Sequence, residues 1–271
     1  MLNYNARACH FTDLDFEVFT NSAKCDIVSE HLNRVFVGSK SGMLFVVNYH
    51  NREIESVFQL HSDAIYSVVA SAGFCITGGA DMFLRVWPTD FSEFYIEAKH
   101  EASVTSVDIS PDALFATCGT DNGCLGLVNI PTYSYKTIHR SHYGQILDMD
   151  MSPCNGNLVT ISKDMTLRVW DMNSFEEICE FKCVEDQPIS VSCHPLVNLF
   201  TIGFESGIIK IFDVETVSEA CELSQHENAV AKIGHSLNGE WFFSMSTDSL
   251  VCLYNCLRTY TPVKTIFSEK T

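Results

Sequence analysis

Three residues in the middle of the chain, His142, Ser162 and Asp164, are of the types that form the catalytic triad of serine hydrolases. In such a triad the serine attacks the substrate, the histidine takes up its proton and the aspartate orients the imidazole. A nucleophile of this kind must also be open to substrate and lie near an oxyanion hole. The Gly-x-Ser-x-Gly turn that exposes the serine of many hydrolases does not accompany the set.

The same residue types recur elsewhere in the chain, and the recurrence argues against catalysis. The histidine precedes the aspartate by 22 residues in two of the sets, and an aromatic residue follows each aspartate. We expect three hydrogen-bonded sets: His142, Ser162, Asp164 and Trp170; His226, Ser246, Asp248 and Tyr254; and His61, Asp81 and Trp87, with Gly79 where the hydroxyl should be. A buried polar network that is fully paired fixes one arrangement of the chain. The repetition therefore predicts a structural role in each module.

Six apolar segments recur with a nearly constant period. Each alternates apolar residues and ends in a polar residue or proline, and their last residues lie 40, 41, 42, 42 and 42 positions apart. The segments are Met43–Asn48, Phe83–Pro88, Cys124–Asn129, Thr166–Asp171, Ile208–Asp213 and Leu250–Asn255. This period is that of the WD repeat. Each repeat then supplies a four-stranded sheet that cannot bury both of its faces alone and must pack on its neighbours.

The predicted fold is therefore all-β, a WD-repeat β-propeller with six recognisable four-stranded blades and almost no helix. Blades are expected at about 21–60, 61–99, 100–141, 142–183, 184–225 and 226–268. In the fourth unit the strands are expected at Ile146–Ser152, Leu158–Lys163, Thr166–Asp171 and Glu177–Lys182. Segment 1–20 is expected to supply one strand of a partial blade. That strand would either close a seven-bladed ring or pair with sequence outside this chain.

The other units depart from the pattern of the histidine sets. Residues of other types stand at the expected places: Asn122 and Val128 beside a retained His100 in the third unit, Ser41 and Val47 in the first, and Ser206 and Phe212 in the fifth. We expect apolar packing to hold these units together.

Composition narrows the class of partner. The chain has 17 Lys and Arg residues against 34 Asp and Glu residues, so its formal net charge is −17. Phosphate backbones and anionic lipids repel such a chain unless basic residues cluster, and here they are scattered singly. We therefore expect neither nucleic acid nor a membrane as partner. The first residues lack the apolar core of a signal peptide, and the 12 cysteines include no Cys-x-x-Cys pair, which favours a reducing, cytosolic setting.

Metal and cofactor sites are not expected. The closest pairs of potential ligands are Cys179 with Cys183, Cys252 with Cys256, and His139 with His142. None of these pairs has the further ligands that a structural zinc ion requires.

Two other features have simple structural interpretations. Arg85 and Arg168 lie in the third strand of their units, where such side chains are expected to extend into solvent or to stack. The Gly78–Gly79 pair is predicted to form a turn, because no Lys-Ser or Lys-Thr follows it as in a phosphate-binding loop.

A longer stretch of the sequence indicates to which family of WD-repeat proteins the chain is similar. The stretch His61–Asp112 contains the run Leu-Arg-Val-Trp-Pro-Thr-Asp-Phe, in which Pro88 replaces the usual aspartate. It resembles the propeller region of the WD repeat-containing protein 90 family of centriole-wall proteins, and a weaker resemblance continues through Ser162–Phe181 to about Asn255. The resemblance implies a role in centriole architecture and cilium assembly, in the cytoplasm and at the cytoskeleton, centriole or basal body. The microtubule-binding domain of that family is not recognisable here, so microtubule contact is expected to be indirect or through a region absent from this chain.

We therefore predict a non-catalytic scaffold that binds other proteins, with centriolar or ciliary components as the expected partners. The alternative is a substrate receptor of a ubiquitin ligase. Receptors of that class often carry Trp-Asp-x-Arg at a blade end, whereas Trp170-Asp171 is followed here by Met172 and Asn173. The fold does not dictate which residues bind the partner, because propeller sites lie on loops.

Overall fold

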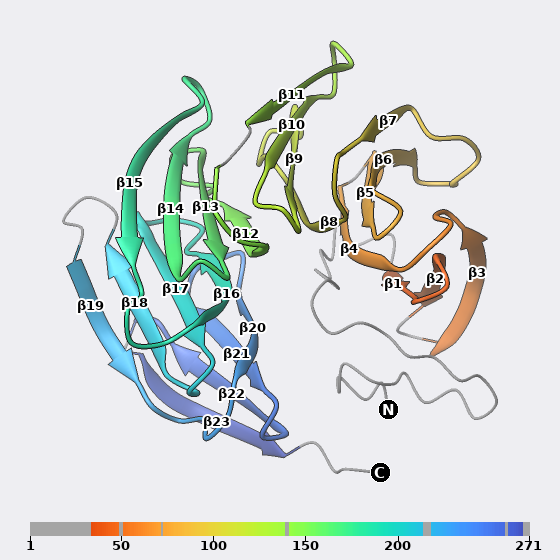
Figure 1. The fold of residues 1–271 in the computed structure, drawn as a ribbon. Helices are drawn as coiled ribbons and strands as arrows, with labels where there is room; N and C mark the ends of the chain where they lie inside the picture. The colour runs from red at the N-terminus through yellow and green to blue at the C-terminus, as the bar shows by residue number, and fades with distance from the viewer. Residues whose placement is uncertain are drawn as a thin grey trace. The chain divides into compact units, whose positions relative to one another are not determined.

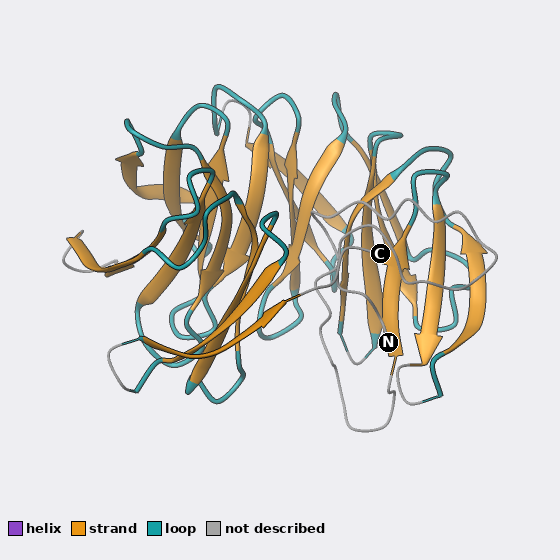
Figure 2. Cartoon of the chain, turned by 90° about the horizontal axis from the view of Figure 1, so that it is seen from below, coloured by secondary structure: helices purple, strands orange, loops and turns teal. Residues whose placement is uncertain are grey.

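The computed structural model describes residues 34–48, 51–71, 73–138, 141–213, 218–257 and 260–267. All regular structure in these residues is β-strand, as Figures 1 and 2 show. The strands form six antiparallel sheets, each made from consecutive strands of the chain. The predicted all-β propeller of WD repeats is thereby confirmed, with each sheet as one blade. The predicted strand in segment 1–20 lies outside the described residues.

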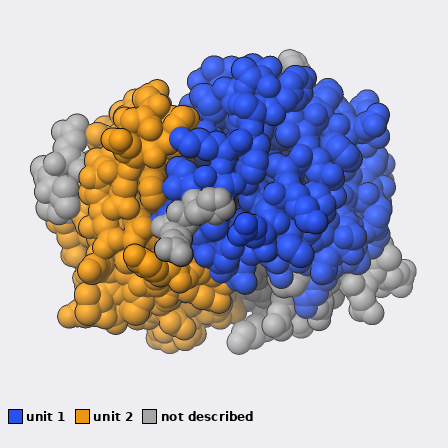
Figure 3. Space-filling view, turned by 45° about the horizontal axis from the view of Figure 1, so that its top comes forward, with its two compact units in different colours: residues 1–141 blue, residues 142–271 orange. Residues whose placement is uncertain are grey.

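The chain divides into two compact units, residues 1–141 and residues 142–271, which are coloured separately in Figure 3. In unit 1 the blades consist of β1 (Arg34–Gly38), β2 (Met43–Asn48) and β3 (Glu53–Gln59); β4 (Ile65–Ala70), β5 (Phe74–Gly79), β6 (Phe83–Pro88) and β7 (Ile96–Lys99); and β8 (Val104–Ile109), β9 (Phe115–Thr120), β10 (Leu125–Asn129) and β11 (Ser134–Ile138). In unit 2 they consist of β12 (Ile146–Met151), β13 (Asn157–Ser162), β14 (Thr166–Asp171) and β15 (Glu176–Lys182); β16 (Pro188–Cys193), β17 (Leu199–Phe204), β18 (Ile209–Asp213) and β19 (Ser218–Leu223); and β20 (Val230–His235), β21 (Trp241–Ser246), β22 (Leu250–Asn255) and β23 (Thr261–Phe267).

The six apolar segments form the third strand of each four-stranded blade and its counterpart β2 in the first sheet. The four strands expected in the fourth unit agree with β12 to β15 within one residue at each end. Alternation places successive side chains on opposite faces of a strand. In β13 and β14 nearly every residue is buried.

Apolar side chains from successive blades form continuous clusters within each unit. In unit 1, Leu84 and Val86 of β6 pack with Val104 and Val107 of β8. In unit 2, residues of β13 and β14 pack in the same way with residues of β16 and β17. Complete burial of one such side chain contributes about 1.5–3 kcal/mol. The blades of a unit are therefore held together mainly by their facing apolar surfaces.

Hydrogen bonds also join the first strands of successive blades. Within unit 1, Val107 donates its backbone N–H to Ser67 Oγ of the preceding blade at 3.0 Å. Within unit 2, Val191 donates to Asp148 at 3.1 Å and Cys193 donates to Asp150 at 2.7 Å. These bonds satisfy buried backbone groups that have no strand partner on that side.

The unusual segment after Pro88 joins two blades of unit 1. Phe91 is only 5% exposed and has a φ of 53°. Its ring lies 5.8 Å from that of Phe36 and 4.9 Å from that of Phe58, both in the preceding blade. Pro88, which replaces the usual terminal aspartate, is thus followed by a phenylalanine whose ring packs between two sheets.

The interpretation of Gly78–Gly79 as a turn was wrong, because both residues belong to β5. A Cβ atom on Gly78 would lie 2.5 Å from Val104 Cγ1, and one on Gly79 would lie 2.5 Å from His61 Nδ1. The two glycines therefore allow a neighbouring strand and a buried histidine to approach the backbone closely. No helix in the described part of the chain is long and apolar enough to cross a membrane.

Candidate functional site: the buried histidine networks

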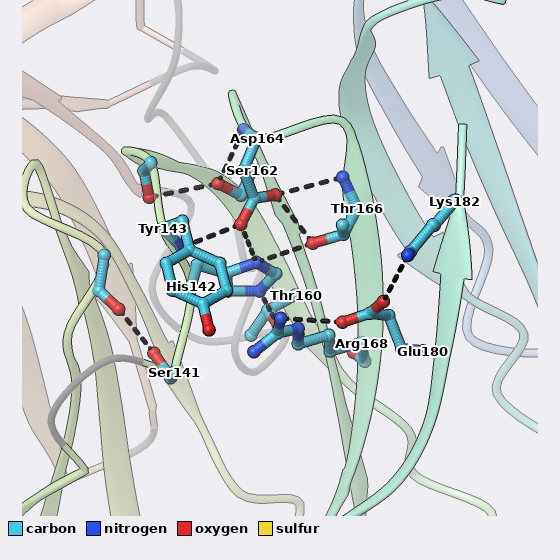
Figure 4. A network of polar contacts seen from close by, with 12 residues as sticks. Ser141, His142, Tyr143, Thr160, Ser162, Asp164, Thr166, Arg168, Glu180 and Lys182 are labelled. Atoms are coloured by element: carbon cyan, nitrogen blue, oxygen red, sulfur yellow. Dashed lines mark hydrogen bonds and ion pairs between the residues drawn. The ribbon is translucent and has the colours of Figure 1, made fainter. Parts of the chain in front are cut away.

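The histidine of the fourth blade lies at the centre of a hydrogen-bond network, shown in Figure 4. His142 Nε2 lies 2.8 Å from Thr160 Oγ1, and Trp170 Nε1 donates to the same hydroxyl at 2.9 Å. On the other side of the ring, His142 Nδ1 lies 3.2 Å from Asp164 Oδ2. One hydroxyl of β13 thus connects the histidine before the blade to the tryptophan of β14.

The prediction that Ser162 supplies this hydroxyl was wrong. Ser162 Oγ donates instead to the carbonyl of Gly144 at 3.0 Å and accepts the backbone N–H of Asp164 at 3.1 Å. Thr160 and Ser162 are two positions apart, so they share a face of β13 and spacing alone does not distinguish them. Thr160 is opposite Arg168 in the register, which brings Trp170 within diagonal reach.

Asp164 fastens the turn between β13 and β14 to the loop that carries His142. Its carboxylate accepts the backbone N–H of Tyr143 at 2.8 Å, the backbone N–H of Thr166 at 3.0 Å and the hydroxyl of Thr166 at 2.6 Å. Burial acts to raise the pKa of Asp164, but these hydrogen bonds outweigh it and the pKa is lowered. The carboxylate is therefore ionised at neutral pH and accepts from both segments.

The second blade repeats this geometry with the same four residue types, and the sixth repeats it with serine in place of threonine and tyrosine in place of tryptophan. In the second blade Thr77 is the shared hydroxyl, 2.6 Å from His61 Nε2 and 2.8 Å from Trp87 Nε1, so the set that Gly79 was thought to leave incomplete is complete.

In the sixth blade Ser244 takes this place instead of Ser246. The corresponding distances are 2.6 Å from His226 Nε2 to Ser244 Oγ, 3.4 Å from Ser244 Oγ to the Tyr254 hydroxyl, and 3.0 Å from His226 Nδ1 to Asp248. Ser246 bonds to the carbonyl of Asn228, as Ser162 does to that of Gly144.

The third blade keeps its histidine but surrounds it with different partners. Cys118 Sγ lies 3.3 Å from His100 Nε2, and the Tyr135 hydroxyl lies 2.8 Å from His100 Nδ1. A Cβ atom on Gly126 would lie 2.6 Å from both Cys118 and His100. The glycine in β10 thus leaves room for a tyrosine of β11, a substitution for which the repeat pattern gave no signal.

Among the described residues, the first and fifth blades contain no histidine network of this kind. In the first, Val37, Phe45 and Val47 form a small apolar cluster. In the fifth, Phe212 stacks on Phe200 with ring centroids 5.6 Å apart, and Ser206 donates its hydroxyl to Asp186. Apolar packing therefore takes the central place in these blades, as the sequence led us to expect.

Both arginines stack on aromatic rings, which is one of the two outcomes expected for them, and both also form ion pairs. The guanidinium carbon of Arg85 lies 4.5 Å from the centre of the Phe83 ring, and that of Arg168 lies 5.9 Å from the centre of the Tyr143 ring. Arg85 pairs with Asp81 at 3.0 Å and with Glu97 at 2.7 Å, and its side chain is 12% exposed. Arg168 pairs with Glu180 at 2.7 Å, and its side chain is 9% exposed. The cross-strand carboxylates compensate the buried charge.

The network around His142 is closed on every side. His142 is 1% exposed, and both ring nitrogens have partners within the fold. Burial lowers the pKa of His142 to about 4, so the ring is neutral at pH 7. A general base must reach a substrate proton, and this ring is directed at three side chains of its own blade, those of Thr160, Asp164 and Thr166. The arrangement can position strands and turns.

The described residues contain no group of three or more potential metal ligands. His139 of the proposed His-x-x-His pair lies outside the described part of the chain. Cys252 is buried and Cys256 partly buried, and both pack in the apolar cluster between the last two blades.

Comparison with known proteins agrees with this architecture. The model of the family described as WD domain, G-beta repeat, matches residues 94–126 and 133–171. WD repeat-containing protein 90 of Xenopus tropicalis is 33% identical over 264 residues, or 90% of this chain. The human protein of that name is 35% identical over 71% of the chain, and Centriole proteome protein 16 of Chlamydomonas reinhardtii is 36% identical over 94%. The chain spans 11–14% of the lengths of these relatives.

The chain is therefore a WD-repeat protein, of the class whose propellers act as scaffolds for protein interaction. Its particular resemblance is to WD repeat-containing protein 90, across most of its own length.

The corrected hydroxyl can be tested by substitution. Thr160→Val keeps the shape of the side chain but removes the partner of both His142 and Trp170. We expect the free energy of unfolding to fall by about 1–3 kcal/mol, the usual cost of an unsatisfied buried polar group. Thermal or denaturant unfolding measures the change. Thr160→Ser retains the hydroxyl and serves as control; equal stability of Thr160→Val and the parent would contradict the assignment.

The low pKa of His142 also predicts a dependence of stability on pH. The unfolded imidazole takes up a proton near its ordinary pKa of 6.5, whereas the folded one does so only near 4. Between these values the unfolded chain binds more protons, so the free energy of unfolding decreases as pH falls from about 6.5 to 4. Unfolding of the parent and of His142→Gln should be compared at several pH values in this window. The parent should lose more stability on acidification; identical pH profiles would refute the assignment.

Proposed function

We propose that this chain is a docking scaffold of the centriole or basal body that takes part in cilium assembly. The observation that carries the proposal is the identity of 33–36% with WD repeat-containing protein 90 and Centriole proteome protein 16 over most of the chain. The second of these names places its bearer in a centriole proteome, and the resemblance of His61–Asp112 implies the same setting. The cytoplasm, cytoskeleton and centriole or basal body are the proposed locations.

The physical properties of the chain support a scaffold role. The histidine networks fasten loops and strands, so the blade ends can present loop residues in fixed positions. The proposed role of the sets around His61, His142 and His226 is architectural. The proposed partners are therefore other proteins, in keeping with the WD-repeat class.

Charge bears on the choice of partner. The formal net charge of −17 disfavours direct contact with acidic surfaces, including the surface of a microtubule. Any microtubule association is proposed to be indirect or to use sequence outside this chain.

The ubiquitin-ligase receptor remains the second candidate, favoured only by the frequency of that use among WD-repeat propellers. Asp171 is followed by Met172 and Asn173, so the arginine of the adaptor-binding pattern is missing. Co-precipitation with a cullin adaptor would support this candidate.

Location in cells tests the proposal. The full chain with a fluorescent tag, expressed in a ciliated cell, is expected to concentrate at centrioles or basal bodies together with a centriole marker. The matched control is the tag alone, which should show no such concentration. A diffuse or nuclear signal from the parent chain at native expression level would contradict the proposal.

A further inference from the structure

Three successive hairpins of unit 2 are joined into one surface. They connect β12 to β13, β16 to β17, and β20 to β21, at residues 152–156, 194–198 and 236–240. Cys154 Sγ donates to the carbonyl of Leu196 at 3.6 Å, and Asn155 donates to the side chain of Asn198. His194 Nε2 donates to the carbonyl of Gly239 at 3.0 Å. The three tips are therefore connected to one another by hydrogen bonds between blades.

The middle hairpin is also fixed internally. His194 Nδ1 accepts the backbone N–H groups of Leu196 and Val197 at 3.1 and 3.3 Å. The corresponding turn of the sixth blade is held by Asn238, which accepts from Glu240 N at 3.1 Å. A surface whose backbone is fixed in advance loses little conformational entropy when it binds.

This rigid surface carries large apolar side chains in water. Leu196 is 62% exposed, Val197 43% and Leu237 89%. Leu257 is 74% exposed and follows Cys256, whose N–H bonds to the carbonyl of Glu240 in the third hairpin. We call these four residues the hairpin platform. Clustered exposed apolar residues on a folded protein mark interaction sites.

The surroundings of the hairpin platform carry negative charge. Asp171 and Asp213 end β14 and β18 opposite Asn157 and Leu199, the residues that follow the first two hairpins. Glu240 in the third hairpin is exposed. No Lys or Arg occurs among the described residues of the hairpins and the neighbouring strand ends at this end of unit 2; Arg258, which follows Leu257 in the sequence, lies outside the described residues. An apolar surface with an acidic border complements an apolar segment flanked by basic residues.

We propose that the hairpin platform binds a segment of a partner protein in which apolar side chains alternate with or are flanked by Lys or Arg. The inference rests on the proposed scaffold function and names its surface. A second copy of this chain is the less suitable occupant, because two chains of net charge −17 repel each other. The apolar side chains of the partner cover Leu196, Leu237 and Leu257, and its basic groups lie over the acidic border.

A peptide library displayed on phage provides the test. Peptides selected on the full chain are expected to contain apolar residues together with Lys or Arg, and a synthetic peptide of the selected sequence should bind in a fluorescence polarisation assay. The double variant Leu196→Ser and Leu237→Ser should weaken binding by at least about tenfold, as expected when central apolar contacts are removed. Raised salt concentration should weaken it as well.

A matched control uses exposed apolar residues at the opposite ends of the same blades. Tyr143 is 86% exposed and Val184 78% exposed, and they lie in the loops that lead into β12 and β16. The double variant Tyr143→Ser and Val184→Ser should retain binding, and both double variants should melt like the parent. Peptides without basic residues, or binding lost only in the control variant, would overturn the proposal.

Two further results test binding at the hairpin platform separately from the proposed centriolar function. A dimer seen by sedimentation and abolished by Leu196→Ser and Leu237→Ser would overturn the choice of occupant. Peptide binding at the platform by a chain that is diffuse in ciliated cells would uphold this inference while contradicting the centriolar role.

Discussion

The structure depends on the burial of blade faces against each other. A four-stranded sheet with apolar residues on both faces is stable only when neighbouring sheets cover it. Within unit 1, Leu84 and Val86 meet Val104 and Val107 in this way, and the same pattern recurs within unit 2. Hydrogen bonds between first strands, such as that from Val191 to Asp148, fix the relative position of two neighbouring sheets, which apolar burial alone does not define.

The histidine networks solve a separate problem, which is how to fix the loops around each sheet. A turn aspartate, a loop histidine and a strand hydroxyl satisfy one another out of water, where an unpaired polar group is costly. The blades reach this end by different means. His100 accepts a thiol and a phenol as partners, whereas the fifth blade uses the stacked rings of Phe200 and Phe212. A fixed set of loops is what a surface such as the hairpin platform requires.

The repeat period and the third strands could be predicted from the sequence, because apolar alternation and a constant interval both leave direct traces in it. The errors have local physical causes. Ser162 and Thr160 share a strand face, so their spacing from Asp164 could not tell them apart. Gly79 and Gly126 have no side chain, and the neighbours that approach them come from elsewhere in the fold. Arg168 was expected to extend into solvent or to stack, and its ion pair with Glu180 was missed because Glu180 lies on another strand, at a register that the sequence alone does not define.

The account makes buried contact between successive blades its central claim, and hydrogen exchange tests that claim most directly. The backbone amides of Val107, Val191 and Cys193 donate to side chains of the preceding blade rather than to backbone carbonyls of a neighbouring strand. They should exchange as slowly as the central strands of the sheets, since release requires the blades to separate. Exchange of these three amides as fast as that of the exposed loop residue Val184 would contradict the account.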